Sequence, residues 1–251
     1  MKKIMLFIGN FFFRWRDTAF TLIFLTAFAM LILHPEHKVG DFQIEIVATL
    51  IGFLFLAAGQ FARAITIGLA YIKRGGLNKQ IYAETLVRRG MFAHCRNPLY
   101  LGNLLIVTGA IFVLNMPLYY LVALPFFYFI YISITLAEEN YLKDQFGPEY
   151  EDYLKSVNRF IPGNFQKWAE STKDMSFTWK RLIKKEHGTF AVVFSANTLF
   201  TILKLHYRYG MEMTSHISMA LWIFFGAIGL FQIVSAIMKR RGMLEWESQR
   251  P

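Results

Sequence analysis

The chain has 251 residues, of which 55% are hydrophobic and 17% aromatic, and it carries a formal net charge of +10 at pH 7. This composition is typical of membrane proteins and excludes a highly charged soluble domain. A single cysteine, Cys95, excludes an internal disulfide and a zinc site built from cysteines.

Six apolar runs predict membrane-spanning helices. A helix needs about 20 apolar residues to cross about 30 Å of hydrocarbon. Because only residues 115–117 separate the third run from the fourth, these two runs are expected to form a tight helical hairpin. We therefore expect an all-α, polytopic transmembrane bundle, with an interfacial helix before its first span. The runs lie at about 17–33, 43–72, 101–116, 118–137, 189–206 and 216–238.

Basic residues gather in alternate loops of this predicted bundle. Most lysines and arginines lie before Thr18, in the loop around 73–96, in segment 138–188 and in the C-terminal tail. The positive-inside rule then places both termini and the two long loops in the cytoplasm, and we expect the chain in the cell membrane. A nucleic-acid-binding surface would not need this alternation, so no nucleic-acid partner is expected. The intervening loops are expected to hold only Lys38, Lys204 and Arg208.

The stretch "RNPLYLG" (96–102) begins the third predicted span. Pro98 biases Asn97 away from helical conformation, so the backbone turns just before the span begins. On the first helical turn, the ring of Tyr100 can line a pocket, and Gly102 allows close approach to the backbone. The same pattern also fits an ordinary membrane entry, in which Arg96 reaches lipid phosphates and Tyr100 joins the aromatic belt.

Glu138 and Glu139 stand side by side at the end of the fourth predicted span. Carboxylates close to hydrocarbon are costly unless they are paired. Neighbouring helical residues point about 100° apart, so the two carboxylates are expected to have different partners. One is expected to pair with a basic residue such as Arg96 or Arg159, and the other to bind a ligand cation. The alternative is a water-exposed helix end.

The combined pattern resembles a known family. "RNPLYLG" followed by "EENYLKDQFGPEYEDYLKSVNRFIP" (138–162) is similar to the membrane methyltransferase superfamily that includes isoprenylcysteine carboxyl methyltransferases and phospholipid N-methyltransferases. A weaker similarity extends back to "GQFARAITIGL" (59–69). Two positions depart from the family pattern: Asn97 replaces the usual histidine, and Asn158 stands where proline is common.

The resemblance implies an enzyme that binds S-adenosylmethionine on the cytoplasmic side and methylates a lipophilic acceptor. The resemblance covers roughly residues 59–162, which we expect to be the methyltransferase core. N-terminal anchoring helices (1–58) are expected before it, and a basic amphipathic cytoplasmic segment (163–188) and an additional C-terminal helix pair (189–251) after it. The implied cofactor-binding residues are Arg96, Asn97, Pro98, Tyr100, Gly102, Glu138 and Glu139. The implied catalytic residues are Arg159 and Glu139.

The acceptor stays open at the level of sequence: a lipid phosphate or amine head group, a prenylated carboxylate or a small thiol. An anionic acceptor needs no general base, because methylation neutralises its charge. An amine must lose a proton, for which Glu139 or a tyrosine is the candidate. Two other functions were weighed, an NADPH-dependent sterol-type reductase and a non-enzymatic membrane scaffold.

Two further groups of polar residues were considered. Arg63 lies inside the second predicted span and is expected to pair with an acidic side chain or a cofactor carboxylate. The six histidines show no i, i+4 metal-ligand spacing on one helix, so no metal site is predicted. His94 is a candidate substitute for the histidine that the motif lacks.

Overall fold

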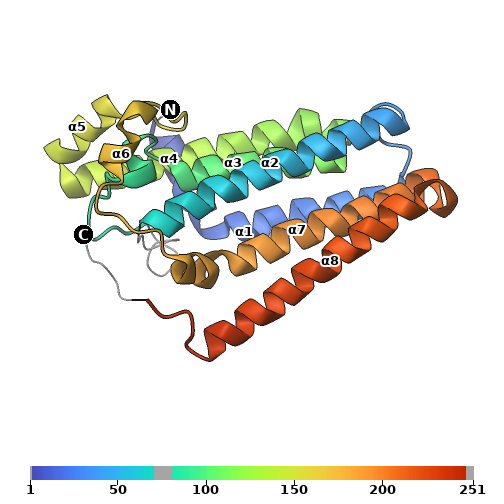
Figure 1. The fold of residues 1–251 in the computed structure, drawn as a ribbon. Coiled ribbons are helices and arrows are strands. Elements are labelled where there is room, and N and C mark those ends of the chain that lie inside the picture. The colour runs from blue at the N-terminus through green and yellow to red at the C-terminus, as the bar shows by residue number, and fades with distance from the viewer. Residues whose placement is uncertain (1, 71–80, 247–251) are drawn as a thin grey trace.

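The computed structural model describes residues 2–70 and 81–246, which form eight α-helices and no β-strand. Figure 1 shows α1, α2, α3, α4 and α7 along the bundle, α8 diverging from α7, and α5 and α6 at one end. The helices are α1 (Lys2–Leu33), α2 (Phe42–Leu69), α3 (Pro98–Leu114), α4 (Leu124–Phe146), α5 (Pro148–Ser156), α6 (Trp168–Ser171), α7 (Trp179–Tyr209) and α8 (Met211–Arg240). Short 3₁₀ helices lie at Gly90–Ala93 and Phe165–Lys167, and a π-helical turn at Tyr119–Ala123 precedes α4.

The predicted transmembrane bundle is confirmed. Five helices are long and apolar enough to cross a membrane: α1, α2, α7, α8, and α4 together with the preceding turn at Tyr119–Ala123. The third predicted span is α3, which has only 17 residues. At about 1.5 Å per residue, this helix is about 26 Å long, slightly less than the hydrocarbon thickness. The α3–α4 connection is the expected tight hairpin, with Asn115 in the left-handed conformation at the end of α3.

Two boundaries differ from the prediction. The expected interfacial helix and first span form one continuous helix, α1, because neither proline nor a turn interrupts Lys2–Leu33. The basic segment 163–188 is not one unit, because α7 begins at Trp179 and the last ten positions of the segment belong to this long helix. The second predicted span ends at Leu69, and the expected extension beyond residue 70 lies outside the described residues.

Glycines bring α2 and α3 into close contact. A Cβ atom added to Gly59 would lie 2.5 Å from the carbonyl oxygen of Gly102, and one added to Gly52 would lie 2.7 Å from that of Gly109. Real Cβ atoms do not approach so closely, so these positions require glycine. Close backbone approach through small residues is a common way for membrane helices to pack. The α2–α3 pair therefore forms a fixed unit on which Arg63 and the start of α3 are placed.

A buried ion cluster joins α2, α3 and α7 at the end of the bundle away from α5 and α6. The Glu45 carboxylate lies 2.7 Å from Lys204 Nζ and 2.7 Å from Arg208 Nη1, and all three side chains are fully buried. Lys204 Nζ also donates to the carbonyl oxygen of Val113, in the last turn of α3. The carbonyl groups in the last turn of a helix have no partner within the helix, and here Lys204 of α7 donates to one of them in α3. Lys204 and Arg208 thus lie inside α7, not in the expected loop.

Candidate active site

The two halves of the sequence motif lie against each other through their backbones. The amide of Arg96 donates to the carbonyl oxygen of Asn158 over 2.9 Å, and the amide of Asn97 donates to that of Arg159 over 3.1 Å. Asn97 has a non-helical backbone just before Pro98, the first residue of α3, as the sequence predicted. This pairing brings the loop after α5 to the start of α3, although more than 50 residues separate them in the chain.

Glu139 holds this junction together. Its carboxylate accepts hydrogen bonds from Arg96 Nη2 at 3.1 Å and from Arg159 Nη2 at 2.8 Å. Asn97 Nδ2 donates to Glu139 Oε1 at 3.3 Å, so the residue that replaces the family histidine keeps a hydrogen bond at this point. The hydrogen bond to Glu139 raises the pKa of the Arg159 guanidinium. Glu139 is therefore the expected paired carboxylate, and both arginines share it.

Arg96 also fixes the end of α5. Its Nη1 donates to the carbonyl oxygen of Leu154 at 3.0 Å and to that of Val157. These carbonyls belong to the last turn of α5 and the residue after it, where helical partners are missing. The α4–α5 boundary itself follows the prediction: Gly147, with φ of +54°, ends α4, and Pro148 begins α5.

Glu138 points elsewhere and lines a cavity of about 870 Å³. The Tyr100 hydroxyl lies beside Glu138 and Arg16, and the Tyr100 ring centroid is 5.9 Å from that of Tyr131. The two glutamates thus have separate partners, as their angular separation in a helix predicted. Of the predicted site residues, Arg96, Asn97, Pro98, Tyr100 and Glu138 line the cavity.

The cavity has two chemically different ends. Charged and polar side chains line the end near α5, and apolar side chains line the part inside the bundle, between α1, α3 and α7. The polar group includes Arg16, Asp17, Arg63, Arg96, Asn97, Tyr100, Asn103 and Glu138, and the polar residues Thr189 and Asn197 of α7 also line the cavity. The apolar group includes Phe20, Ile23, Phe24, Phe28, Ile106, Val107, Ala110, Leu114, Val192 and Val193.

Arg16 is the main site residue that the sequence analysis missed. It lies in α1, far from the motif in sequence, and its charge was interpreted only as a sign of topology. Its side chain is 19% exposed, and its ion-pair partner Asp17, 3.7 Å away, is 96% exposed. A cation at this partly buried position, whose ion-pair partner Asp17 is almost entirely in solvent and whose other neighbours include Tyr100 and Glu138, is well suited to an anionic ligand group. No motif spacing could have identified it, because only the fold brings α1 to α3 and α4.

Gly102 and Arg63 have structural partners. A Cβ atom on Gly102 would lie 2.5 Å from Arg63 Cγ and 2.9 Å from the carbonyl oxygen of Gly59, so the close approach that this glycine permits is to α2. Arg63 forms a buried two-point ion pair with Glu186 of α7, with Nε–Oε2 and Nη2–Oε1 distances of 2.9 Å. Arg63 also donates to Asn103 and lines the polar end of the cavity. Its predicted acidic partner is therefore Glu186.

Glu139, Arg159, His94 and Cys95 do not line the cavity among the described residues. The carboxylate of Glu139 is occupied by two guanidinium groups, which argues against its predicted role as a general base. Both ring nitrogens of His94 are engaged away from the site, by the Gly163 carbonyl and Ser171 Oγ. His94 therefore does not replace the motif histidine. Cys95 is buried, and burial raises the pKa of its thiol to about 11.

The comparisons with known proteins agree with this assembly. Residues 47–149 match the model of the phospholipid methyltransferase family, a segment that runs from α2 to the start of α5. The match includes Arg96, Glu138 and Glu139 but ends before Arg159. No significant match was found among curated proteins or solved structures. The chain is thus an integral membrane protein whose segment 47–149 carries the phospholipid methyltransferase pattern, which confirms the predicted resemblance to membrane methyltransferases.

Proposed function

We propose that the protein transfers the methyl group of S-adenosylmethionine to a lipophilic acceptor at the cytoplasmic side of the membrane. The observation that carries this proposal is the two-ended cavity, whose polar end lies beside the family motif and whose apolar part extends between the membrane helices. An amphiphile fits such a space with its head group at the polar end and its hydrocarbon chain between α1 and α7.

The polar end contains the groups that the cofactor requires. S-adenosylmethionine, when bound, supplies an electrophilic methyl group on a sulfonium, and it also carries an ammonium and a carboxylate. The Glu138 carboxylate and the Tyr100 ring suit the cationic groups. Arg16 offers N–H donors to the carboxylate. Asn97, whose side-chain amide donates to Glu139 and to the Arg159 carbonyl, forms the adjacent wall of the cavity. These residues come from α1, α3, α4 and the loop before α3, so the complete donor set exists only in the folded bundle.

The acceptor is proposed to enter from the lipid between α1 and α7. Leu25 of α1 and Val192 of α7 both line the cavity, and they are 58% and 70% exposed. Apolar side chains that line a cavity and also reach the surface mark an opening toward the surrounding hydrocarbon. A head group that enters this way loses its water, which favours methyl transfer to an anionic acceptor.

The adjacent carboxylates Glu138 and Glu139 have different proposed tasks. Glu139 positions Arg96 and Arg159 and thereby the loop that closes the polar end. Glu138 replaces Glu139 as the candidate group to accept a proton from an amine acceptor, because Glu138 lines the cavity. For a carboxylate or phosphate acceptor, no proton has to be removed, and alignment of the two reactants within the cavity provides the acceleration.

The proposal is tested first by ligand-dependent stability. The thermal midpoint of the detergent-purified protein is measured with S-adenosylhomocysteine, with NADPH and with no ligand, because a ligand that binds only the folded state raises the midpoint. A rise with S-adenosylhomocysteine alone, which Glu138→Gln removes, supports the methyltransferase. A rise with NADPH alone overturns it in favour of a reductase, and no rise with either ligand favours a scaffold.

The acceptor is then sought in liposomes with methyl-labelled cofactor. Label that appears in the extracted lipid fraction, and not in that of Glu138→Gln, identifies the lipid class that is methylated. Val192→Trp should narrow the opening between α1 and α7 and lower the rate with a long-chain acceptor, while the S-adenosylhomocysteine-dependent rise in thermal midpoint persists. If Val192→Trp leaves the rate unchanged for every chain length, the acceptor does not enter through this opening.

A further inference from the structure

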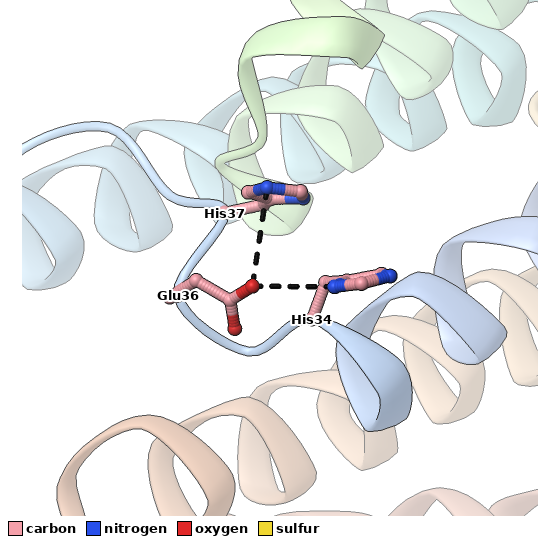
Figure 2. Close-up of side chains that lie close together, drawn as sticks. All are labelled: His34, Glu36 and His37. Atoms are coloured by element: carbon pink, nitrogen blue, oxygen red, sulfur yellow. Dashed lines mark hydrogen bonds and ion pairs between the residues drawn. The ribbon is translucent and has the colours of Figure 1, made fainter.

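The turn between α1 and α2 gathers two imidazoles and one carboxylate. Figure 2 shows His34, Glu36 and His37 with the carboxylate beside the two rings, which stack on each other with centroids 5.1 Å apart. His34 Nδ1 lies 3.2 Å from Glu36 Oε1, and His37 Nε2 lies 3.9 Å from the same oxygen. One ligand atom from each residue lies within 4.8 Å of the other two. The absence of i, i+4 histidine spacing on one helix led to the prediction of no metal site, because this group lies in a turn between helices.

These distances are close to those around a bound transition metal ion. Zinc lies about 2.0–2.2 Å from nitrogen and oxygen ligands, so two ligand atoms on one tetrahedral ion are about 3.3 Å apart. The separations of 3.2 Å and 3.9 Å lie on either side of that value, and small rotations of exposed side chains can correct the difference. Two imidazoles with one carboxylate favour zinc, copper, nickel or iron over the harder magnesium and calcium ions.

The backbone of the turn is held in place by the bundle. Arg208 Nε donates to the Pro35 carbonyl at 3.2 Å, and its Nη2 donates to the His37 carbonyl at 3.3 Å. Val39 donates its amide to the Asn115 carbonyl and accepts a hydrogen bond from Asn115 Nδ2. A turn that is already fixed on both sides of Glu36 loses little further conformational freedom when it binds an ion.

The surrounding charges also allow a cation. The Arg208 guanidinium contacts the turn, but its charge is paired with the Glu45 carboxylate at 2.7 Å. Lys38 Nζ donates to Tyr209 OH at 2.7 Å and lies over the Tyr209 ring, so its charge is directed to α7.

We propose that His34, Glu36 and His37 form a binding site for a divalent transition metal ion at the end of the bundle opposite the methyltransferase motif. The three side chains are between half and two-thirds exposed, so a bound ion keeps open positions for water or another ligand. The ion joins the last turn of α1 to the segment that leads into α2. Its binding is independent of the methyl-transfer proposal, because no residue of the motif takes part.

The test is titration of the full-length protein, in detergent and without an affinity histidine tag, with Zn²⁺ by isothermal titration calorimetry. We expect one equivalent to bind and to raise the thermal midpoint. His34→Gln, Glu36→Gln and His37→Gln should each weaken binding by roughly tenfold or more, because each removes one of three protein ligands. His216→Gln, which changes an exposed histidine in α8, is the matched control and should bind Zn²⁺ like the original chain.

Two results overturn the site. The first is Zn²⁺ binding that the His34→Gln/His37→Gln double variant retains, or that His216→Gln weakens equally. The second concerns the unmodified protein, so it does not depend on whether a variant folds. With one equivalent of Cu²⁺, electron paramagnetic resonance should show coupling to imidazole nitrogen. A spectrum without nitrogen coupling, or Zn²⁺ that a tenfold excess of Mg²⁺ displaces, contradicts the proposal.

Discussion

Arg159 and Glu139 form a two-point ion pair, with Nη2–Oε2 and Nε–Oε1 distances of 2.8 Å and 3.0 Å. Arg159 belongs to the loop after α5, whereas Glu139 lies in α4, so the pair attaches the loop to the bundle. Its neighbour Glu138 lines the cavity instead. One of the two adjacent carboxylates thus has a structural position, and the other is the proposed ligand-binding group, so substitution can separate the two roles.

Glu139→Gln is predicted to destabilise the protein, and Glu138→Gln to impair ligand binding. Glu139→Gln leaves the Arg96 and Arg159 guanidinium groups without their shared anion. Because Arg96 and Glu139 are largely buried, the free energy of unfolding should fall by on the order of 3 kcal/mol. Glu138→Gln leaves the ion pairs of Glu139 intact. Thermal midpoints with and without S-adenosylhomocysteine distinguish the two effects. A large drop in the ligand-free midpoint for Glu138→Gln would contradict this division of roles.

Gly59→Ala is predicted to weaken the contact between α2 and α3. The new Cβ atom would lie 2.5 Å from the Gly102 carbonyl oxygen, so the helices must separate. Overpacking of this kind costs about 1–3 kcal/mol. The control is Gly226→Ala in α8, where no atom lies within 4 Å of the added Cβ and alanine should stabilise the helix by roughly 0.5–1 kcal/mol. Thermal midpoints of both variants that move in the same direction would contradict the prediction.

The Arg63–Glu186 pair is predicted to show strong coupling in a double-mutant cycle. Each single change, Arg63→Met or Glu186→Leu, leaves a buried charge without its partner and should cost about 3–5 kcal/mol. The double variant removes both charges and should be more stable than either single variant. Denaturation of the four proteins in detergent measures the coupling. Additive effects would show that the two side chains do not interact.

Cys95 is predicted to react slowly with iodoacetamide in the folded protein. Burial raises the pKa of its thiol to about 11, above the ordinary value of about 8.5. A raised pKa means less thiolate at a given pH, so at pH 8 the reactive fraction falls on the order of 100-fold relative to the unfolded chain. Mass spectrometry of folded and denatured samples measures the rates. Equal rates would place Cys95 at an accessible surface.

The sequence predicted the all-α bundle and much of the motif geometry, because both depend on local patterns. The length of an apolar run decides whether it can span a membrane, and Pro98 and Gly147 decide where helices begin or end. The separation of Glu138 from Glu139 followed from the angle between helical neighbours. These inferences need no knowledge of which helices are neighbours.

The remaining site residues depend on tertiary contacts. Arg16 joins the polar end only because α1 lies beside α3 and α4, and Glu186 became the partner of Arg63 because α7 begins earlier than its apolar run indicates. Gly102 was assigned to the cofactor, although its missing side chain makes room for α2. In each case the local pattern was correct, and the identity of the neighbouring helix decided the role.

The two buried ion clusters of α7 also determine which wall of the lipid opening can move. Glu186 fixes the early part of α7 to Arg63 of α2, and Lys204 fixes its late part to Glu45 of the same helix. A swing of α7 would break one of these pairs, whereas α1 packs on α4 through aromatic rings such as Phe20 and Phe127. Apolar contacts have no fixed direction and rearrange at lower cost. If the acceptor enters as proposed, we therefore predict that α1 moves more readily than α7, and a fusion partner attached to the start of α1 should slow acceptor exchange more than one attached after α8.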